Sequence, residues 1–182
     1  MAIFAAIELD EQARETALRA MESVAAAMPG LRSERPEKLH VTLAYVGRVE
    51  SESIPSFAAA LEQAAGSCAQ FEIVFDTLGG FGKKRRPHVI AYTCSTRHQP
   101  FERCAGTVRA AFAKLGAVFE HDALPHLTIA RAKHGVREVS RIHAPQPCVV
   151  AAREIVLLES IPAGETTRYE KRAVAPLRAA GI

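Results

Sequence analysis

The chain has 182 residues, enough for one domain with a full hydrophobic core or for two small lobes sharing an interface. Hydrophobic residues make up 48% and charged residues 24%, as in ordinary globular proteins, and a net charge of +3 is too small to indicate a nucleic-acid partner by itself. The apolar start, residues 2–9, is too short to cross a membrane and lacks the basic lead of a signal peptide. The sequence therefore predicts a cytoplasmic protein without a membrane partner.

The first half predicts a strand followed by a helix. Residues 2–9 form the strand, and Asp10 can cap the helix that follows it. Apolar residues recur three to four apart along this helix, as one buried face requires, and Pro29-Gly30 ends it. The residues predicted for the buried face are Leu18, Met21, Ala25 and Met28.

The later elements follow the same signals. A helix is expected from Ser53 to Ala65, a strand at 71–75, and a loop at the glycine-rich residues 79–82. A second long helix starts near Pro100 and ends at Gly116, and short strands follow at 148–150, 155–158 and 167–174. The apolar face of this second helix consists of Phe101, Cys104, Val108, Phe112 and Leu115.

A short motif occurs twice. His40 lies in the sequence Leu-His-Val-Thr-Leu-Ala and His126 in Pro-His-Leu-Thr-Ile-Ala, at an offset of 126 − 40 = 86 residues. Gly30 and Gly116 are separated by the same offset. The alternative to an internal duplication is two unrelated amphipathic helices, but this alternative does not explain two matching motifs. We therefore predict one α+β domain over 1–182, duplicated and bilobal. Two antiparallel sheets would flank a central groove, with helices outside and a pseudo-twofold axis between the lobes.

Each motif suits acid–base chemistry. Side chains alternate along a strand, so His40 and Thr42 face one side, as do His126 and Thr128. Histidine gives or takes a proton near neutral pH, and a cyclic phosphate ester needs both actions during hydrolysis. Threonine hydroxyls can donate hydrogen bonds to the non-bridging phosphate oxygens. The pair of motifs thus predicts a phosphoesterase that needs no metal or other cofactor.

The chain resembles the two-histidine phosphoesterase superfamily, specifically its RNA 2′,3′-cyclic phosphodiesterase branch, historically called 2′-5′ RNA ligase. The matching residues are the two H-x-T strands and the stretches 36–43, 86–89, 125–131 and 164–170. The resemblance implies that His40 is the proton donor to the leaving 3′ oxygen and His126 the proton acceptor that activates water. It further implies a 2′-phosphate product, an RNA substrate such as a tRNA fragment, and no obligate protein partner.

Other residues are candidates for binding. Thr42, Thr128 and Arg131 are expected at the phosphate, although Arg131 lies five residues after His126 and faces the same side only if the strand bends. RNA contacts are expected from an aromatic side chain and from a basic run. These candidates are Tyr45, Lys83, Lys84, Arg85 and Arg86.

Several alternatives stay open. The same histidines could join RNA ends through a 2′-5′ bond, or could act on a related cyclic nucleotide or an ADP-ribose cyclic phosphate. An RNA-binding module without catalysis is also conceivable, but both histidines and both threonines are present. His121, Asp122 and His126 could in principle bind a metal ion. The spacing H-D-x-x-x-H, however, shows no third ligand that would converge with the others on one ion.

Overall fold

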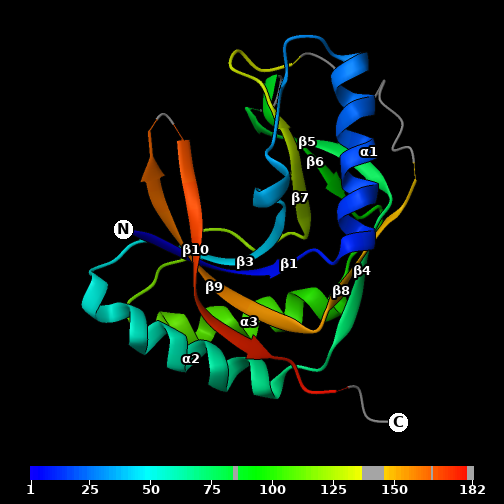
Figure 1. The fold of residues 1–182 in the computed structure, drawn as a ribbon. Coiled ribbons are helices and arrows are strands. Elements are labelled where there is room, and N and C mark those ends of the chain that lie inside the picture. The colour runs from blue at the N-terminus through cyan, green and yellow to red at the C-terminus, as the bar shows by residue number, and fades with distance from the viewer. Residues whose placement is uncertain (84–85, 137–145, 165, 180–182) are drawn as a thin grey trace.

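We describe a computed structural model in which residues 1–83, 86–136, 146–164 and 166–179 are placed (Figure 1). The first half contains β1 (Ala2–Glu8), α1 (Glu11–Ala27), β2 (Arg32–Ser33), β3 (His40–Arg48) and α2 (Ile54–Ser67). The second half contains β4 (Phe71–Phe75), β5 (Thr77–Lys83), β6 (Arg86–Thr93), α3 (Gln99–Ala113), β7 (His126–Arg131), β8 (Cys148–Ala152), β9 (Glu154–Ala163) and β10 (Thr166–Pro176).

The strands form one large antiparallel sheet and one small one. The large sheet has the order β10-β9-β1-β3-β7-β6-β5, with β2 paired to β7, and the small sheet consists of β4 and β8. Within the large sheet, β3 and β7 are joined by the pair Val41 and Leu127, and β2 of the first half also pairs with β7. The predicted α+β class is confirmed. Two antiparallel sheets are present, as expected, and the two lobes join within the larger one.

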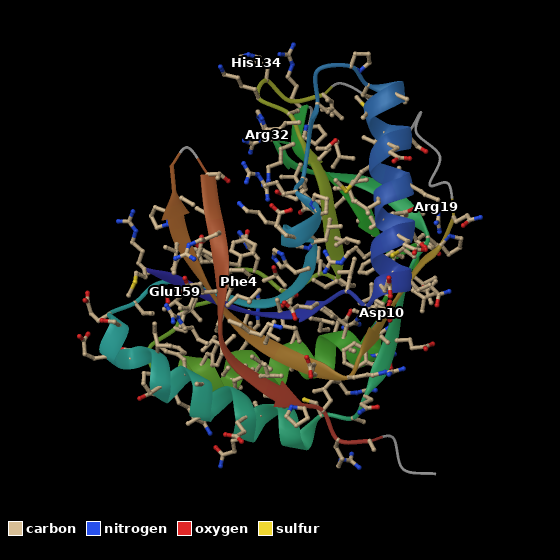
Figure 2. All side chains as sticks on the ribbon, in the orientation of Figure 1. Phe4, Asp10, Arg19, Arg32, His134 and Glu159 are labelled. Carbon is tan, nitrogen blue, oxygen red and sulfur yellow. The ribbon has the colours of Figure 1, made fainter. Side chains whose placement is uncertain are left out.

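The helices cover the lobes crosswise. Helix α1 follows β1 but packs against β7 and β8, whereas α3 follows β6 and packs against β3 and α2 (Figure 1). The side chain of Asp10 caps α1 by accepting a hydrogen bond from the backbone N–H of Ala13 at 2.8 Å (Figure 2). The loops after α1 and α3 contain Gly30 and Gly116, whose φ values of 99° and 91° favour glycine.

The buried face of α1 differs from the predicted one. Of the four predicted residues only Met21 is buried, and Ala25 is exposed. The core is contacted instead by Ala13, Thr16, Ala17, Ala20 and Val24. Small side chains let a helix approach a sheet closely, so the alanines carry the contact that the larger residues were expected to make.

Matching bulges interrupt β3 and β7. On β3, Ala44 pairs with Ala5 and Thr42 with Ala6, so that Leu43 is an extra residue. On β7, Ala130 pairs with Ile90 and Thr128 with Ala91, which leaves Ile129 as the extra residue. A bulge shifts the alternation of side chains beyond it by one residue. The residue five positions after each histidine therefore faces the same side as that histidine.

The prediction of a glycine-rich loop at residues 79–82 is wrong, because these residues lie within β5. Strand β5 ends the large sheet, where glycine is tolerated more readily than in a central strand. A Cβ atom on Gly79 would lie 3.1 Å from the Thr93 side chain, so its absence makes room for that neighbour. Among the described residues, no helix combines the length and the apolar character that a membrane span requires.

Candidate active site

A groove lies on the face of the large sheet opposite the core, where β3 and β7 meet. Its volume is about 320 Å³. Both predicted histidines and both predicted threonines line it, together with residues from β1, β9 and β10. The full lining is Phe4, His40, Thr42, Tyr45, His126, Thr128, Arg131, Ser160 and Tyr169.

Backbone carbonyls hold the two imidazoles in equivalent ways. Nδ1 of His40 lies 2.6 Å from the carbonyl oxygen of Lys38, and Nδ1 of His126 lies 2.8 Å from that of Leu124. A carbonyl oxygen only accepts, so each Nδ1 carries the proton and donates it. In a neutral ring Nε2 is then the unprotonated nitrogen, available to accept a proton. The two carbonyl groups are themselves 86 residues apart (124 − 38).

Aromatic rings fix the orientation of both imidazoles. The centroid of the Phe4 ring lies 5.0 Å from that of His40, and Phe4 extends from β1 (Figure 2). The Phe81 ring lies 5.0 Å from the His126 ring at a similar tilt. The Tyr169 ring meets His40 edge-on at 5.5 Å. Packing of this kind restricts each side chain to few orientations.

The electrostatic surroundings of the two histidines differ. Burial lowers the pKa of His40 below 6.5, the carbonyl of Lys38 opposes this effect, and repulsion from a charged His126 adds to it. In the free protein His40 is therefore mainly neutral near pH 7. A phosphate anion between the rings would favour the charged form.

The threonines and Arg131 complete the polar lining. Thr42 Oγ1 lies 3.1 Å from Nε2 of His40, so this hydroxyl can donate to the free nitrogen when no substrate is bound. Arg131 faces the groove because the strand bulges at Ile129. This bulge is the bend that a residue five positions after His126 needs in order to face the same side. Its Nε lies 3.0 Å from Oε2 of Glu34, which keeps the guanidinium beside the groove.

One wall of the groove comes from the β9–β10 hairpin, which sequence reasoning did not place there. The hairpin contributes Ser160 and Tyr169. Nζ of Lys38 donates to Oγ1 of Thr166 at 3.1 Å and of Thr167 at 2.9 Å, which ties the hairpin to the segment before His40. Lys38 thus holds both a wall of the groove and, through its carbonyl, one imidazole.

The predicted RNA contacts fall into two groups. Tyr45 lies in the groove wall and is 58% exposed, so its ring face is accessible. Arg86 is exposed at the start of β6, and Lys83 ends β5. Lys84 and Arg85 lie outside the described residues.

Comparison with known proteins agrees with this geometry. Residues 7–91 match the sequence profile of the family described as LigT like Phosphoesterase. A relative from Archaeoglobus fulgidus named RNA 2′,3′-cyclic phosphodiesterase is 28% identical over 142 residues, covering 78% of each chain. The crystal structure of TT0787 of Thermus thermophilus superposes with a TM-score of 0.83 at 23% identity and covers all of both chains.

The crystal structure of E. coli LigT in its apo form has a TM-score of 0.77 at 22% identity and covers 97% of this chain and 96% of that one. At such identity these two structures show a shared fold. Residues 7–91, slightly less than half of the chain, are thus similar to the LigT-like phosphoesterase family.

Proposed function

We propose that this protein hydrolyses 2′,3′-cyclic phosphates at RNA ends to 2′-phosphomonoesters. The observation that carries the proposal is the pair of imidazoles in one groove, each with Nδ1 held by the carbonyl two residues upstream. Acid–base catalysis requires proton donors and acceptors at fixed positions around the reacting atoms. The name of the Archaeoglobus relative supports the choice of RNA as substrate.

The hydrolysis needs one acid and one base, and we assign these roles to the histidines as the family resemblance implies. Nε2 of His126 takes a proton from water as the water oxygen bonds to phosphorus. The bond from phosphorus to O3′ breaks, and Nε2 of His40 gives its proton to that oxygen. A 2′-phosphate remains, and proton exchange with solvent restores both rings. The lowered pKa of His40 means that it acts as the acid only once the substrate anion favours its protonated form.

The other groove residues bind the phosphate and the nucleoside. Thr42, Thr128 and Arg131 would donate hydrogen bonds to the non-bridging oxygens, where negative charge concentrates in the transition state. Tyr45 would stack on the terminal base. The basic residues at 83–86 would attract the RNA backbone, with tRNA fragments as one candidate substrate. We further propose that 1–182 is one duplicated domain that works in the cytoplasm.

The direct test is a panel of substrates. We expect the protein to open a 2′,3′-cyclic phosphate on an oligonucleotide, with and without excess chelator, and to leave a 3′,5′-cyclic nucleotide intact. Hydrolysis of the 3′,5′-cyclic nucleotide alone would contradict the proposal. The same assay with an added RNA that has a 5′-hydroxyl end measures the joining of RNA ends through a 2′-5′ bond. Joining uses the same two histidines for proton transfer in the reverse direction. Water is abundant, so hydrolysis should dominate.

A further inference from the structure

A second and larger cavity lies beside His126. Its volume is about 590 Å³, within the range of small-ligand sites. It is enclosed by the segment that leaves β6, by one face of α3 and by the residues just before β7. The residues that matter below are Phe81, Thr93, Gly106, Arg109, Asp122 and Leu124.

Several residues that line the cavity also contact His126 of the groove. Thr93 pairs directly with His126, so the two side chains lie on the same face of the sheet. Phe81, whose ring packs on His126, also lines the cavity, and so does Leu124, whose carbonyl holds the imidazole. A chain bound at the groove could therefore continue into the cavity.

The His40 side offers no such space. The pocket beside His40 has a volume of only about 100 Å³. Tyr169 and Lys171 of β10 line it, and Nζ of Lys171 lies 2.7 Å from Oε2 of Glu8. The pseudo-symmetric halves thus differ at the place where a substrate would leave the groove.

The two halves also differ at one helix position. The buried residues of α1 at 13, 16, 17, 20 and 24 correspond to those of α3 at 101, 104, 105, 108 and 112, an offset of 101 − 13 = 88. The same offset places Leu18 on Gly106. A Cβ atom at Gly106 would meet nothing within 4 Å. The second half therefore has open space where the first half has a leucine side chain.

The lining fits an uncharged, planar group with donors and acceptors. Nε of Arg97 lies 2.8 Å and 2.7 Å from the two carboxylate oxygens of Glu102, so these charges balance. Arg109 donates to the carbonyl of His121 at 2.7 Å, while its buried Nε has no hydrogen-bond partner among the described residues. Asp122 adds an acceptor to the lining. Carboxylates there disfavour a phosphate, whereas a nucleobase can use both kinds of group.

We infer that this cavity binds the base of the nucleotide that precedes the terminal one in the RNA, an inference that rests on the proposed function. The terminal base has Tyr45 beside the phosphate site. The cavity lies past Phe81 and Leu124 on the His126 side, whereas the pocket on the His40 side is much smaller. Substrates of two or more nucleotides should accordingly be preferred over a mononucleotide.

The variant Gly106→Leu tests this inference because it fills the cavity without touching the groove. Gly66→Leu is the matched control, since Gly66 also lies exposed in a helix, α2, with open space around it. We expect Gly106→Leu to lower kcat/KM about tenfold for a dinucleotide with a 2′,3′-cyclic phosphate, the effect of losing one stacked base. For a 2′,3′-cyclic mononucleotide the change should stay within about twofold, a small part of that tenfold effect. Equal effects on both substrates, or none on either, would overturn the inference.

Calorimetric binding separates this inference from the proposed function. A dinucleotide ending in a 3′-phosphate should bind about tenfold more weakly to Gly106→Leu than to the wild type, and a mononucleoside 3′-phosphate equally to both. Arg109→Met, which carries the residue found at the equivalent place in α1, should weaken the dinucleotide alone. Unchanged dinucleotide binding in both variants would exclude the cavity as the site, whether or not any cyclic phosphate is hydrolysed.

Discussion

Leu43 and Ile129 occupy equivalent places in the two halves of the chain, each as the extra residue of a bulge three positions after a histidine of the groove. The consequence is that Tyr45 and Arg131 both face the groove. One half thus contributes an aromatic ring and the other a guanidinium at the same structural position. The groove is symmetric in its histidines and asymmetric in the residues that would contact a substrate.

Removal of the guanidinium should weaken phosphate binding. A hydrogen bond to a charged group contributes about 1.5–3 kcal/mol, so Arg131→Ala should lower kcat/KM on a 2′,3′-cyclic phosphate by roughly 10- to 100-fold. Arg153→Ala, an exposed arginine before β9, is the control and should have wild-type kinetics. Steady-state assays measure both. Wild-type kcat/KM in Arg131→Ala would show that this arginine does not bind the phosphate.

The position of Arg131 illustrates what sequence could and could not predict. The repeated motif was sufficient to predict His40 and His126 in one groove, because alternation along a strand depends on local sequence alone. The bulge at Ile129 depends on the register with β6, which no single strand encodes. Tyr169 comes from a hairpin more than a hundred residues after His40, so only the folded chain brings the two rings together.

The glycine-rich residues 79–82 show a prediction from local sequence that was wrong. Local propensity favoured a loop, but pairing with β6 holds these residues in a strand. For the same reason, sequence reasoning missed Phe81 as the residue that packs on His126. Tertiary pairing overrode the local preference.

The pKa of His40 can be measured by NMR titration of the histidine ring protons. Burial should place it below 6.5 in the free protein, and inorganic phosphate should raise it, since an anion favours the charged ring. A pKa for His40 at or above 6.5 without phosphate would contradict the described environment.

The same shift predicts how stability depends on pH. Between the lowered pKa of the folded state and 6.5, the unfolded chain binds a proton at residue 40 that the folded chain does not. This contribution to stability is therefore complete above pH 6.5 and is lost as the pH falls through the lowered pKa. Urea unfolding of His40→Asn should show a weaker loss of stability on acidification than the wild type.

Lys38 should act as a positioning residue. Lys38→Met removes the hydrogen bonds from Nζ to Thr166 and Thr167 but keeps the backbone carbonyl that holds His40. Two such hydrogen bonds contribute about 1 kcal/mol each, so we expect kcat/KM to fall by roughly 30-fold. KM should account for most of the change, because the hairpin wall loosens while the histidines remain. A change confined to kcat would mean that Lys38 acts on the chemistry instead.

The ion pair between Glu159 and Arg172 should matter for stability. Glu159 on β9 (Figure 2) is fully buried. Nε of Arg172 contacts its carboxylate. Arg172→Ala leaves a buried charge without its partner, which should lower the free energy of unfolding by roughly 2–4 kcal/mol. The double variant with Glu159→Gln should recover part of this loss in urea unfolding. No recovery would assign the effect to lost packing of the arginine stem.

The most direct measurement of the central claim follows an oligonucleotide with a 2′,3′-cyclic phosphate by phosphorus NMR. The wild type should convert the cyclic signal to a 2′-phosphomonoester, and His134→Asn should do the same. His40→Asn and His126→Asn should each slow the reaction by about 10³-fold while keeping the fold. A 3′-phosphate product would contradict O3′ as the leaving oxygen, and wild-type turnover by either groove variant would contradict catalysis by two histidines on one phosphate.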